Sequence, residues 1–343
     1  MRKLMNTLYV TTPDVYLSLD GENVVILKED EKLLRMPLHN LEGIMTFGYT
    51  GASPALMGKC AERGIALSFL TAHGRFIASV CGETQGNVIL RRTQYRAADD
   101  DDKCLDIARS ILIGKLYNSR WVLERATRDH ADRIDVSKIK SICYQIVGLL
   151  HDVNNAKTYG ELLGIEGNAA SRYFSVFDEL ILQSKEAFFF KERSRRPPLD
   201  NINALLSFFY TMLSHDIAAA LTTVGLDPFV GFLHKDRPGR RSLALDILEE
   251  LRAPLVDRFV LTLVNTRQVN VDDFEQRENG AVYLKDNARR TVLGAWQTRK
   301  QSLIEHPFIK ERIEWGLVPH VQALLMARFF RGDLDAYPPF LWK

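Results

Sequence analysis

The sequence predicts an α+β protein with a small β-rich N-terminal domain followed by a larger all-α domain. Short runs rich in β-branched and aromatic residues, separated by turn signals, fill residues 1–90. Long stretches with helical spacing of apolar residues fill residues 104–343. Between them, a basic stretch and four consecutive aspartates predict a linker over residues 91–103.

The N-terminal domain is expected to be a set of hairpins interrupted by one helix. Asp20-Gly21 and the charged stretch Lys28–Lys32 supply turns between the first runs. The helix is predicted from Ser53 to Glu62, where Arg63-Gly64 ends it. Strands are expected at residues 7–10, 15–19, 23–27, 66–70 and 75–80.

The second domain is expected to be helical throughout. Aspartates at 99–102 suit the start of its first helix, because the helix dipole favours negative charge there. Pro254 is expected to stop a helix. Helices are predicted at residues 105–123, 137–150, 156–182, 202–223, 242–252, 283–300 and 308–330.

The composition is that of an ordinary globular protein. The 343 residues are 46% hydrophobic and carry a formal net charge of +2, so nucleic-acid binding must rest on local basic clusters. The four scattered cysteines match neither a zinc site nor a disulfide framework. With no signal-peptide core and no apolar run of about 20 residues, we expect a cytoplasmic protein that does not use a membrane.

One helical face between residues 164 and 174 carries a carboxylate beside small side chains. Glu166, Ala169, Ala170 and Tyr173 fall at i, i+3, i+4 and i+7, so they share that face. The two alanines leave room beside Glu166 for a hydrated metal ion or a nucleic-acid backbone. The alternative is that they allow close helix packing while Glu166 pairs locally.

A second candidate group follows a segment punctuated by glycine and proline. His234 ends this segment, and the next helix carries Asp246 beside its apolar stripe. A buried carboxylate without a partner is costly, and a cation would resolve that cost. Glu166, His234 and Asp246 therefore predict a site for Mg²⁺ or Mn²⁺, with the imidazole favouring Mn²⁺.

Basic residues gather near these motifs in three groups. Their sign and position predict contacts with DNA phosphates, largely independent of base sequence. The groups are Arg91, Arg92 and Arg96; Arg193, Arg195 and Arg196; and Arg237, Arg240 and Arg241.

Three motifs in order resemble the CRISPR-associated adaptation integrase, the larger of the two universal Cas proteins of spacer acquisition. The first runs from Gly164 to Phe174. The second runs from Arg193 to Asp200 and leads into Asn203–Tyr210. The third runs from Gly225 through His234 into the helix bearing Asp246. The resemblance spans essentially the whole chain, and the sequence of residues 245–250 is similar to that of the subtype I-C branch.

The resemblance implies a metal-dependent enzyme that joins 3′-hydroxyl ends of short DNA fragments to the CRISPR repeat, or cuts DNA as an endonuclease. It assigns Glu166, His234 and Asp246 as metal ligands. Glu249 stands where many members have a second aspartate, which leaves open whether it binds metal directly or through water. It also implies a homodimer formed through the β-rich domain, and a small companion Cas protein as partner.

Two alternatives remain open at the level of sequence. His151-Asp152 and His215-Asp216 are dipeptides typical of HD-type metal phosphohydrolases, with His130 as a further ligand candidate. A non-catalytic DNA-binding scaffold with a decayed site is the second alternative. Metal-dependent cleavage or joining of DNA would distinguish the enzyme from the scaffold.

Overall fold

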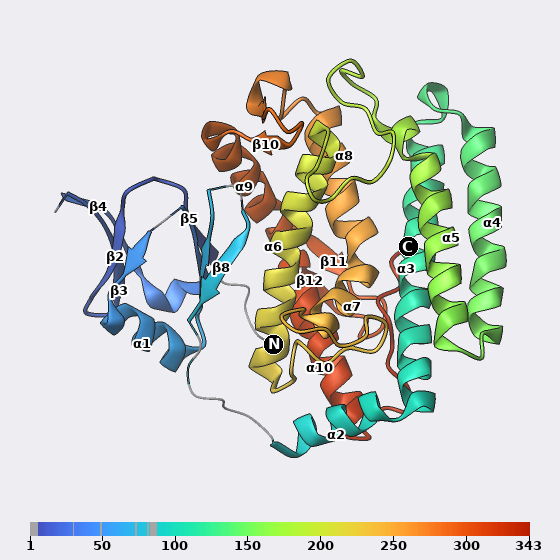
Figure 1. The fold of residues 1–343 in the computed structure, drawn as a ribbon, viewed down its shortest axis with the longest axis horizontal. Coiled ribbons are helices and arrows are strands. Elements are labelled where there is room, and N and C mark those ends of the chain that lie inside the picture. Colours follow the sequence, from blue (N-terminus) through green and yellow to red (C-terminus); the bar gives the residue numbers. More distant parts are fainter. Residues whose placement is uncertain (1–5, 30, 49, 73, 81, 83–87) are drawn as a thin grey trace. The chain divides into compact units, whose positions relative to one another are not determined.

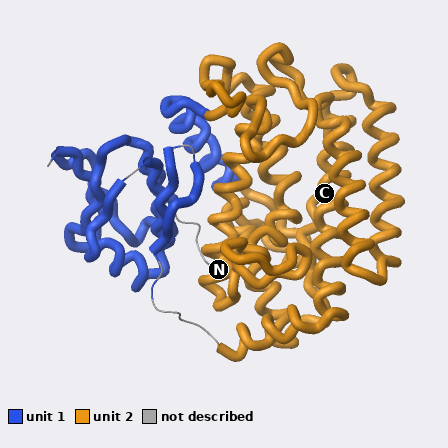
Figure 2. The backbone as a smooth tube through the Cα atoms, viewed as in Figure 1, with its two compact units in different colours: residues 1–86, 284–302 blue, residues 87–283, 303–343 orange. Residues whose placement is uncertain are grey.

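The computed structural model describes residues 6–29, 31–48, 50–72, 74–80, 82 and 88–343. The chain forms two compact units (Figure 2), and the first is discontinuous in sequence. Unit 1 comprises residues 1–86 and 284–302, and unit 2 comprises residues 87–283 and 303–343. The boundary therefore differs from a simple division near residue 90, because a late segment returns to the N-terminal unit.

Unit 1 contains two four-stranded sheets. In the first, of order β1-β5-β7-β8, the pairs β1–β5 and β5–β7 are parallel and β7–β8 is antiparallel. The second has the order β4-β3-β2-β6. The strands are β1 (Asn6–Val10), β2 (Tyr16–Asp20), β3 (Asn23–Lys28), β4 (Glu31–Pro37), β5 (Leu41–Phe47), β6 (Gly51–Ala52), β7 (Ala66–Leu70) and β8 (Phe76–Ser79).

Turn and cap residues set the local structure of unit 1 as the sequence predicts. Asp20 pairs with Asn23 across a two-residue loop in which Gly21 has φ +58°. Helix α1 (Pro54–Arg63) begins where the Ser53 side chain accepts the Leu56 N–H at 3.2 Å. It ends at Gly64, whose left-handed conformation suits glycine. The strands β4, β5 and β6 were not predicted. For β4 the reason is that its first residues lie in a charged stretch typical of turns.

Helix α9 (Asp286–Gln301) completes unit 1 from far along the chain. Its Trp296 is fully buried. Its Lys300, also buried, lies with its ammonium 3.4 Å from Glu42 and 3.5 Å from the Thr7 hydroxyl. A buried lysine needs such partners, so this contact explains why residues 284–302 belong with the sheets.

Unit 2 is mainly helical, as expected, but its helical region begins earlier in the sequence than predicted. The predicted linker over residues 91–103 is instead helical apart from Asp100, whose side chain caps α3 by accepting the Lys103 N–H at 3.1 Å. Helices α3, α4 and α5 pack side by side (Figure 1). The helices are α2 (Val88–Asp99), α3 (Asp101–Asp129), α4 (Val136–Asn155), α5 (Tyr159–Ser175), α6 (Asn201–Val224), α7 (Ser242–Leu251), α8 (Arg258–Asn265) and α10 (Val318–Phe330).

Some predicted helices are shorter than the sequence indicated, and the one predicted over residues 156–182 is α5, which covers Tyr159–Ser175. The last begins at Val318, because residues 312–314 form strand β12 and pair with β11. The helix predicted from Tyr283 begins at Asp286, because Tyr283 lies in strand β10. The short strands are β9 (Phe274–Gln276), β10 (Val282–Leu284), β11 (Leu303–Glu305) and β12 (Arg312–Glu314).

Helix α6 is long and apolar enough to span a membrane by length and composition. However, 72% of its most apolar window is buried inside the protein. This is the pattern of a core helix, and α6 packs against α7 and α10.

Pro254 does not stop the chain's helical path, contrary to the sequence prediction. Residues Arg252–Asp257 form a π-helical turn that joins α7 to α8, and all six are buried. Proline cannot donate to the carbonyl four residues earlier, so the Glu250 carbonyl is freed. The Asn118 side chain replaces the missing donor at 2.7 Å.

The apolar C-terminal tail docks within unit 2. The Asn118 amide nitrogen donates to the Phe340 carbonyl at 2.6 Å, and the Trp342 N–H donates to the Asn118 amide oxygen at 2.8 Å. The Phe340 N–H donates to the Glu250 carboxylate at 2.8 Å. The Trp342 ring lies 4.4 Å from the Arg258 guanidinium. These contacts fix the tail against α3 and α7.

Buried His306, beside this tail, predicts an acid-sensitive step in stability. Its Nε2 lies 3.1 Å from the Gln322 amide oxygen, and its Nδ1 accepts the Phe308 and Ile309 N–H groups. Burial lowers the pKa of His306 to about 4, although the Gln322 hydrogen bond acts the other way. The folded protein thus resists a second proton that the unfolded chain accepts near pH 6.5.

We expect the free energy of unfolding to fall as the pH drops from about 6.5 to about 4, by roughly 3 kcal/mol from this group. Urea unfolding at several pH values should show a smaller fall for His306→Gln than for the wild type. Parallel profiles for the two proteins would contradict the assignment.

Candidate active site

Asp246 anchors the loop that carries His234. Its carboxylate is fully buried near the middle of α7. Oδ2 accepts the N–H groups of Phe232 at 2.6 Å and Leu233 at 3.1 Å, and Oδ1 accepts that of His234 at 2.9 Å. Three backbone N–H groups and one ring nitrogen therefore form hydrogen bonds with the carboxylate. These bonds offset the free energy of burying it.

The loop can reach α7 only because residue 231 is a glycine. A Cβ atom at Gly231 would stand 2.7 Å from Ser242 atoms and 2.9 Å from the Asp246 carboxylate. The Tyr159 hydroxyl on α5 donates to the Leu233 carbonyl and fastens the loop from the other side. The loop is therefore held between α5 and α7.

The same carboxylate orients the His234 ring. Nδ1 of His234 lies 2.7 Å from Asp246 Oδ1, so the ring donates its Nδ1–H and keeps Nε2 free to accept or to bind a ligand. A carboxylate behind Nδ1 is the arrangement that orients metal-binding histidines. The His234 side chain is 29% exposed, so its outer edge is accessible.

Glu166 and Glu249 meet through one ammonium group. Lys115 on α3 forms ion pairs with both carboxylates, and its distance to Glu249 is 2.7 Å. The Lys115 side chain is 5% exposed and that of Glu249 is 9% exposed, while Glu166 is 30% exposed. The Arg252 guanidinium donates to both oxygens of Glu249, at 2.9 and 2.7 Å. We call these four residues the ionic ladder.

The cations of the ladder keep Glu249 ionised. Burial acts to raise the pKa of Glu249, but Arg252 and Lys115 outweigh it and hold that pKa well below its usual range. His234 also acts on Glu249 in the same direction. Glu249 is therefore a carboxylate within electrostatic reach of His234.

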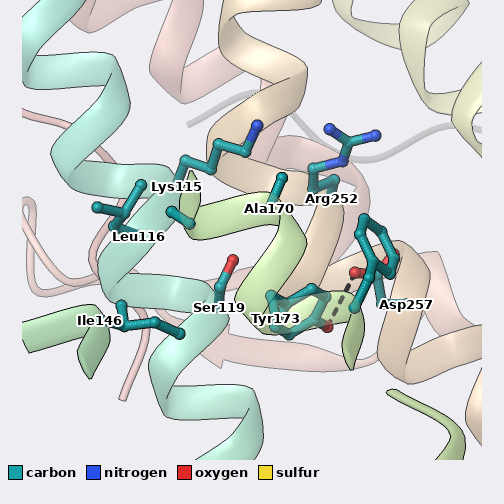
Figure 3. A pocket seen from close by; sticks show the side chains of 10 residues that line it. Lys115, Leu116, Ser119, Ile146, Ala170, Tyr173, Arg252 and Asp257 are labelled. Carbon is teal, nitrogen blue, oxygen red and sulfur yellow. Dashed lines mark hydrogen bonds between the residues drawn. The ribbon is translucent and has the colours of Figure 1, made fainter. Parts of the chain in front are cut away.

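A small pocket lies beside the ladder (Figure 3). The Asp257 carboxylate accepts the Tyr173 hydroxyl at 3.0 Å and the Tyr210 hydroxyl. The Arg252 guanidinium lies 4.6 Å from the centre of the Tyr210 ring. Lys115, Ala169, Ala170, Tyr173 and Arg252 are among the lining residues. Ala169 and Ala170 therefore border a pocket, and Glu166 pairs with Lys115, which is distant in sequence.

The structure groups the predicted metal ligands in pairs. His234 contacts Asp246, and Glu166 is linked to Glu249 through Lys115. Within the residues described, no three His, Cys, Asp or Glu side chains converge as a ready metal site. The donor chemistry still fits one divalent ion, because two carboxylates already share one cation and an oriented imidazole is nearby.

The arginines predicted to contact DNA have different surroundings. Arg193 is turned inward, where it donates to Asn203 and Ser207, and burial lowers its pKa to about 10. Arg240 donates to the Lys235 carbonyl, and Arg241 contacts His215 at 3.0 Å. The exposed members are Arg92, Arg96, Arg195, Arg196 and Arg237, and Arg91 is half-buried.

The HD dipeptides do not build a second centre. His151 and Asp152 are exposed on α4. His215 is buried on α6 beside Arg241, and burial followed by that charge lowers its pKa to about 4. The close approach at Gly231 and the buried carboxylates of Asp246 and Glu249 lie instead within residues 231–252.

Comparison with known families identifies the family of this chain. Residues 8–298 match the family model described as CRISPR associated protein Cas1. The chain belongs to the Cas1 family. A CRISPR-associated endonuclease Cas1 of Chlorobaculum tepidum is 51% identical over the full length of both chains, and one of Rhodospirillum rubrum is 50% identical, also over both full lengths. The expected enzyme class, a nuclease or integrase of the CRISPR system, is confirmed.

Solved structures share the fold. A casposase bound to its integration product superimposes with a TM-score of 0.85 at 23% identity, covering 99% of this chain and 95% of that one. A Cas1 protein of Thermotoga maritima gives a TM-score of 0.82 at 23% identity, covering 97% of this chain and 99% of that one. The predicted order of a β-rich region followed by a helical region is confirmed.

The sequence interpretation missed Lys115 as the partner of Glu166 and Glu249. Lys115 is a lone charge within the apolar stretch Ile111–Leu116, and such a charge signals a buried partner. Arg252 follows Glu249 by three residues, a spacing that brings side chains together on a helix.

Replacing Gly231 with alanine should damage the site. The new methyl group would clash with Ser242 and Asp246, so we expect a cost of about 1–3 kcal/mol and a large loss of nuclease activity. Gly167→Ala is the matched control, because nothing lies within 4 Å of its added Cβ atom on α5. Thermal melting and cleavage assays on both variants test this, and equal activity in the two would contradict it.

Proposed function

We propose that this Cas1 protein is a divalent-metal-dependent DNA integrase and endonuclease. The supporting observation is the pair Glu166 and Glu249, which already share one positive charge beside the oriented ring of His234. Carboxylate oxygens and one imidazole nitrogen are donors that suit Mg²⁺ or Mn²⁺.

In this proposal, Glu166, His234 and Glu249 hold the ion, and Asp246 positions His234. This assignment differs from the one implied by the family resemblance, which made Asp246 a direct ligand and left Glu249 open. The reason is that backbone N–H groups of the loop engage both oxygens of Asp246, whereas Glu249 contacts the same side-chain ammonium as Glu166.

When bound, the ion would polarise a phosphoryl oxygen and stabilise the negative charge that develops during displacement. The residues around it then orient the groups. Asp246 keeps the His234 ring fixed through Nδ1. Arg252 holds Glu249 through two hydrogen bonds, so the carboxylate cannot rotate freely. Exposed arginines such as Arg237 neutralise phosphates along the DNA.

The substrate in this proposal is DNA. A 3′-hydroxyl of a short fragment attacks a phosphodiester of the CRISPR repeat, and the displaced 3′-oxygen leaves. One phosphodiester replaces another, so no nucleotide is consumed. Structural neighbours support this class, since they include a casposase bound to an integration product, a Cas1–DNA complex, and a Cas6-RT-Cas1–Cas2 complex that is 25% identical with a TM-score of 0.82.

The same comparisons support a Cas partner. We infer a complex with the small companion adaptation protein, a homodimer formed through unit 1, and a cytoplasmic location. We also assign the chain to subtype I-C on the resemblance of residues 245–250. Subunit stoichiometry from light scattering, with and without the companion protein, tests the assembly.

Neutral substitutions at the proposed ligands should abolish joining and cleavage. We expect Glu166→Gln, His234→Ala and Glu249→Gln each to lower the rate roughly 100-fold or more, because each removes one ligand. The assay combines a short duplex, a supercoiled repeat-bearing plasmid, the companion protein and Mn²⁺, and scores covalent joining.

Glu161→Gln is the control, since Glu161 lies on the same helix but is exposed and accepts the nearby Lys157 N–H. It should keep wild-type rates. Wild-type rates in Glu166→Gln would refute the proposed site. Protein that binds branched DNA but never alters it with Mn²⁺ would favour a non-catalytic scaffold instead.

A further inference from the structure

Lys115 occupies the position in which the two proposed carboxylate ligands converge. Its ammonium contacts Oε1 of Glu166 and Oε2 of Glu249, which come from α5 and α7, while Lys115 itself comes from α3. The side chain is only 5% exposed, so this contact is a built part of the interior. Three helices therefore meet at one positive charge.

The charges of the ionic ladder are balanced. Glu166 and Glu249 contribute two negative charges, and Lys115 and Arg252 contribute two positive charges. Two carboxylates brought this close without a cation would repel strongly in a poorly solvated site. Lys115 therefore holds them in position when no other cation is present.

Both oxygens of Glu249 are already engaged. Arg252 donates to Oε1 and Oε2, and Lys115 contacts Oε2. An ion that bridges Glu249 and Glu166 must take the place of the Lys115 ammonium, which now contacts both carboxylates. Arg252 is buried with its guanidinium over the Tyr210 ring, whereas Lys115 has four rotatable bonds and lies beside Glu166, which is 30% exposed.

We propose that Lys115 is a resident counter-ion that competes with the metal, so that binding of a divalent ion requires its ammonium to leave Glu166 and Glu249. Lys115 is thus a positioning residue that aligns the ligands in advance and lowers their affinity for metal. This inference rests on the proposed metal site.

The competition can be measured without DNA. Titration of Mn²⁺ into the purified full chain, followed by the electron paramagnetic resonance signal of free Mn²⁺, gives the dissociation constant. We expect Lys115→Met to bind Mn²⁺ roughly tenfold tighter than the wild type, because a repelling charge is removed. A purely structural role predicts equal or weaker binding, and either result would overturn the proposal.

Thermal melting provides an independent readout. In EDTA, Lys115→Met should melt below the wild type, because its two carboxylates lack a cation. Saturating Mn²⁺ should raise its melting temperature more than it raises that of the wild type. An equal rise in both proteins would argue against exchange.

Two further variants separate the possible failures. Lys300→Met removes a buried lysine paired with Glu42 in unit 1, so it should lose stability without changing Mn²⁺ affinity. Glu166→Gln should lose the Mn²⁺ site. If the wild type shows no Mn²⁺ binding that depends on Glu166, the proposed function fails. If that binding is present and Lys115→Met does not tighten it, only the role of Lys115 fails.

Discussion

The site depends on one electrostatic constraint, which is that Glu166 and Glu249 cannot approach each other inside the helical unit without a shared positive charge. Lys115 supplies that charge from α3, and Arg252 fixes the inner carboxylate from the π-helical turn after α7. The close approach of α3 to α7 is part of the same arrangement, since a Cβ atom at Gly114 would stand 3.1 Å from the Glu250 side chain.

Helix α7 carries three buried carboxylates with three different partners. Asp246 holds the loop that carries His234, Glu249 joins the ionic ladder, and Glu250 receives the C-terminal tail through the Phe340 N–H. Burial raises the pKa of Glu250 to about 8, in contrast to Glu249 one residue earlier. The pKa values of Glu249 and Glu250 thus shift in opposite directions, because the two side chains face different elements.

Much of this could be predicted from sequence, because turn residues, caps and helical periodicity are local. Ser53 and Gly64 bounded α1 correctly, and the motifs around Glu166 and His234 contain two residues whose side chains have buried charged partners. Contacts distant in sequence could not be predicted. The partner of Glu166 lies 51 residues earlier, and Pro254 failed as a stop signal because Asn118, 132 residues before Glu250, satisfies the freed carbonyl.

The return of α9 to the β-rich unit has a consequence for biosynthesis. Glu42 and its partner Lys300 are separated by 258 positions, so the ribosome makes nearly the whole polypeptide before that acid meets its base. Until then the nascent sheets lack the buried Trp296 as well. The N-terminal unit therefore completes its interior late, after most of the helical unit has been synthesised, and a gene fragment that encodes only the first ninety codons would omit part of its core.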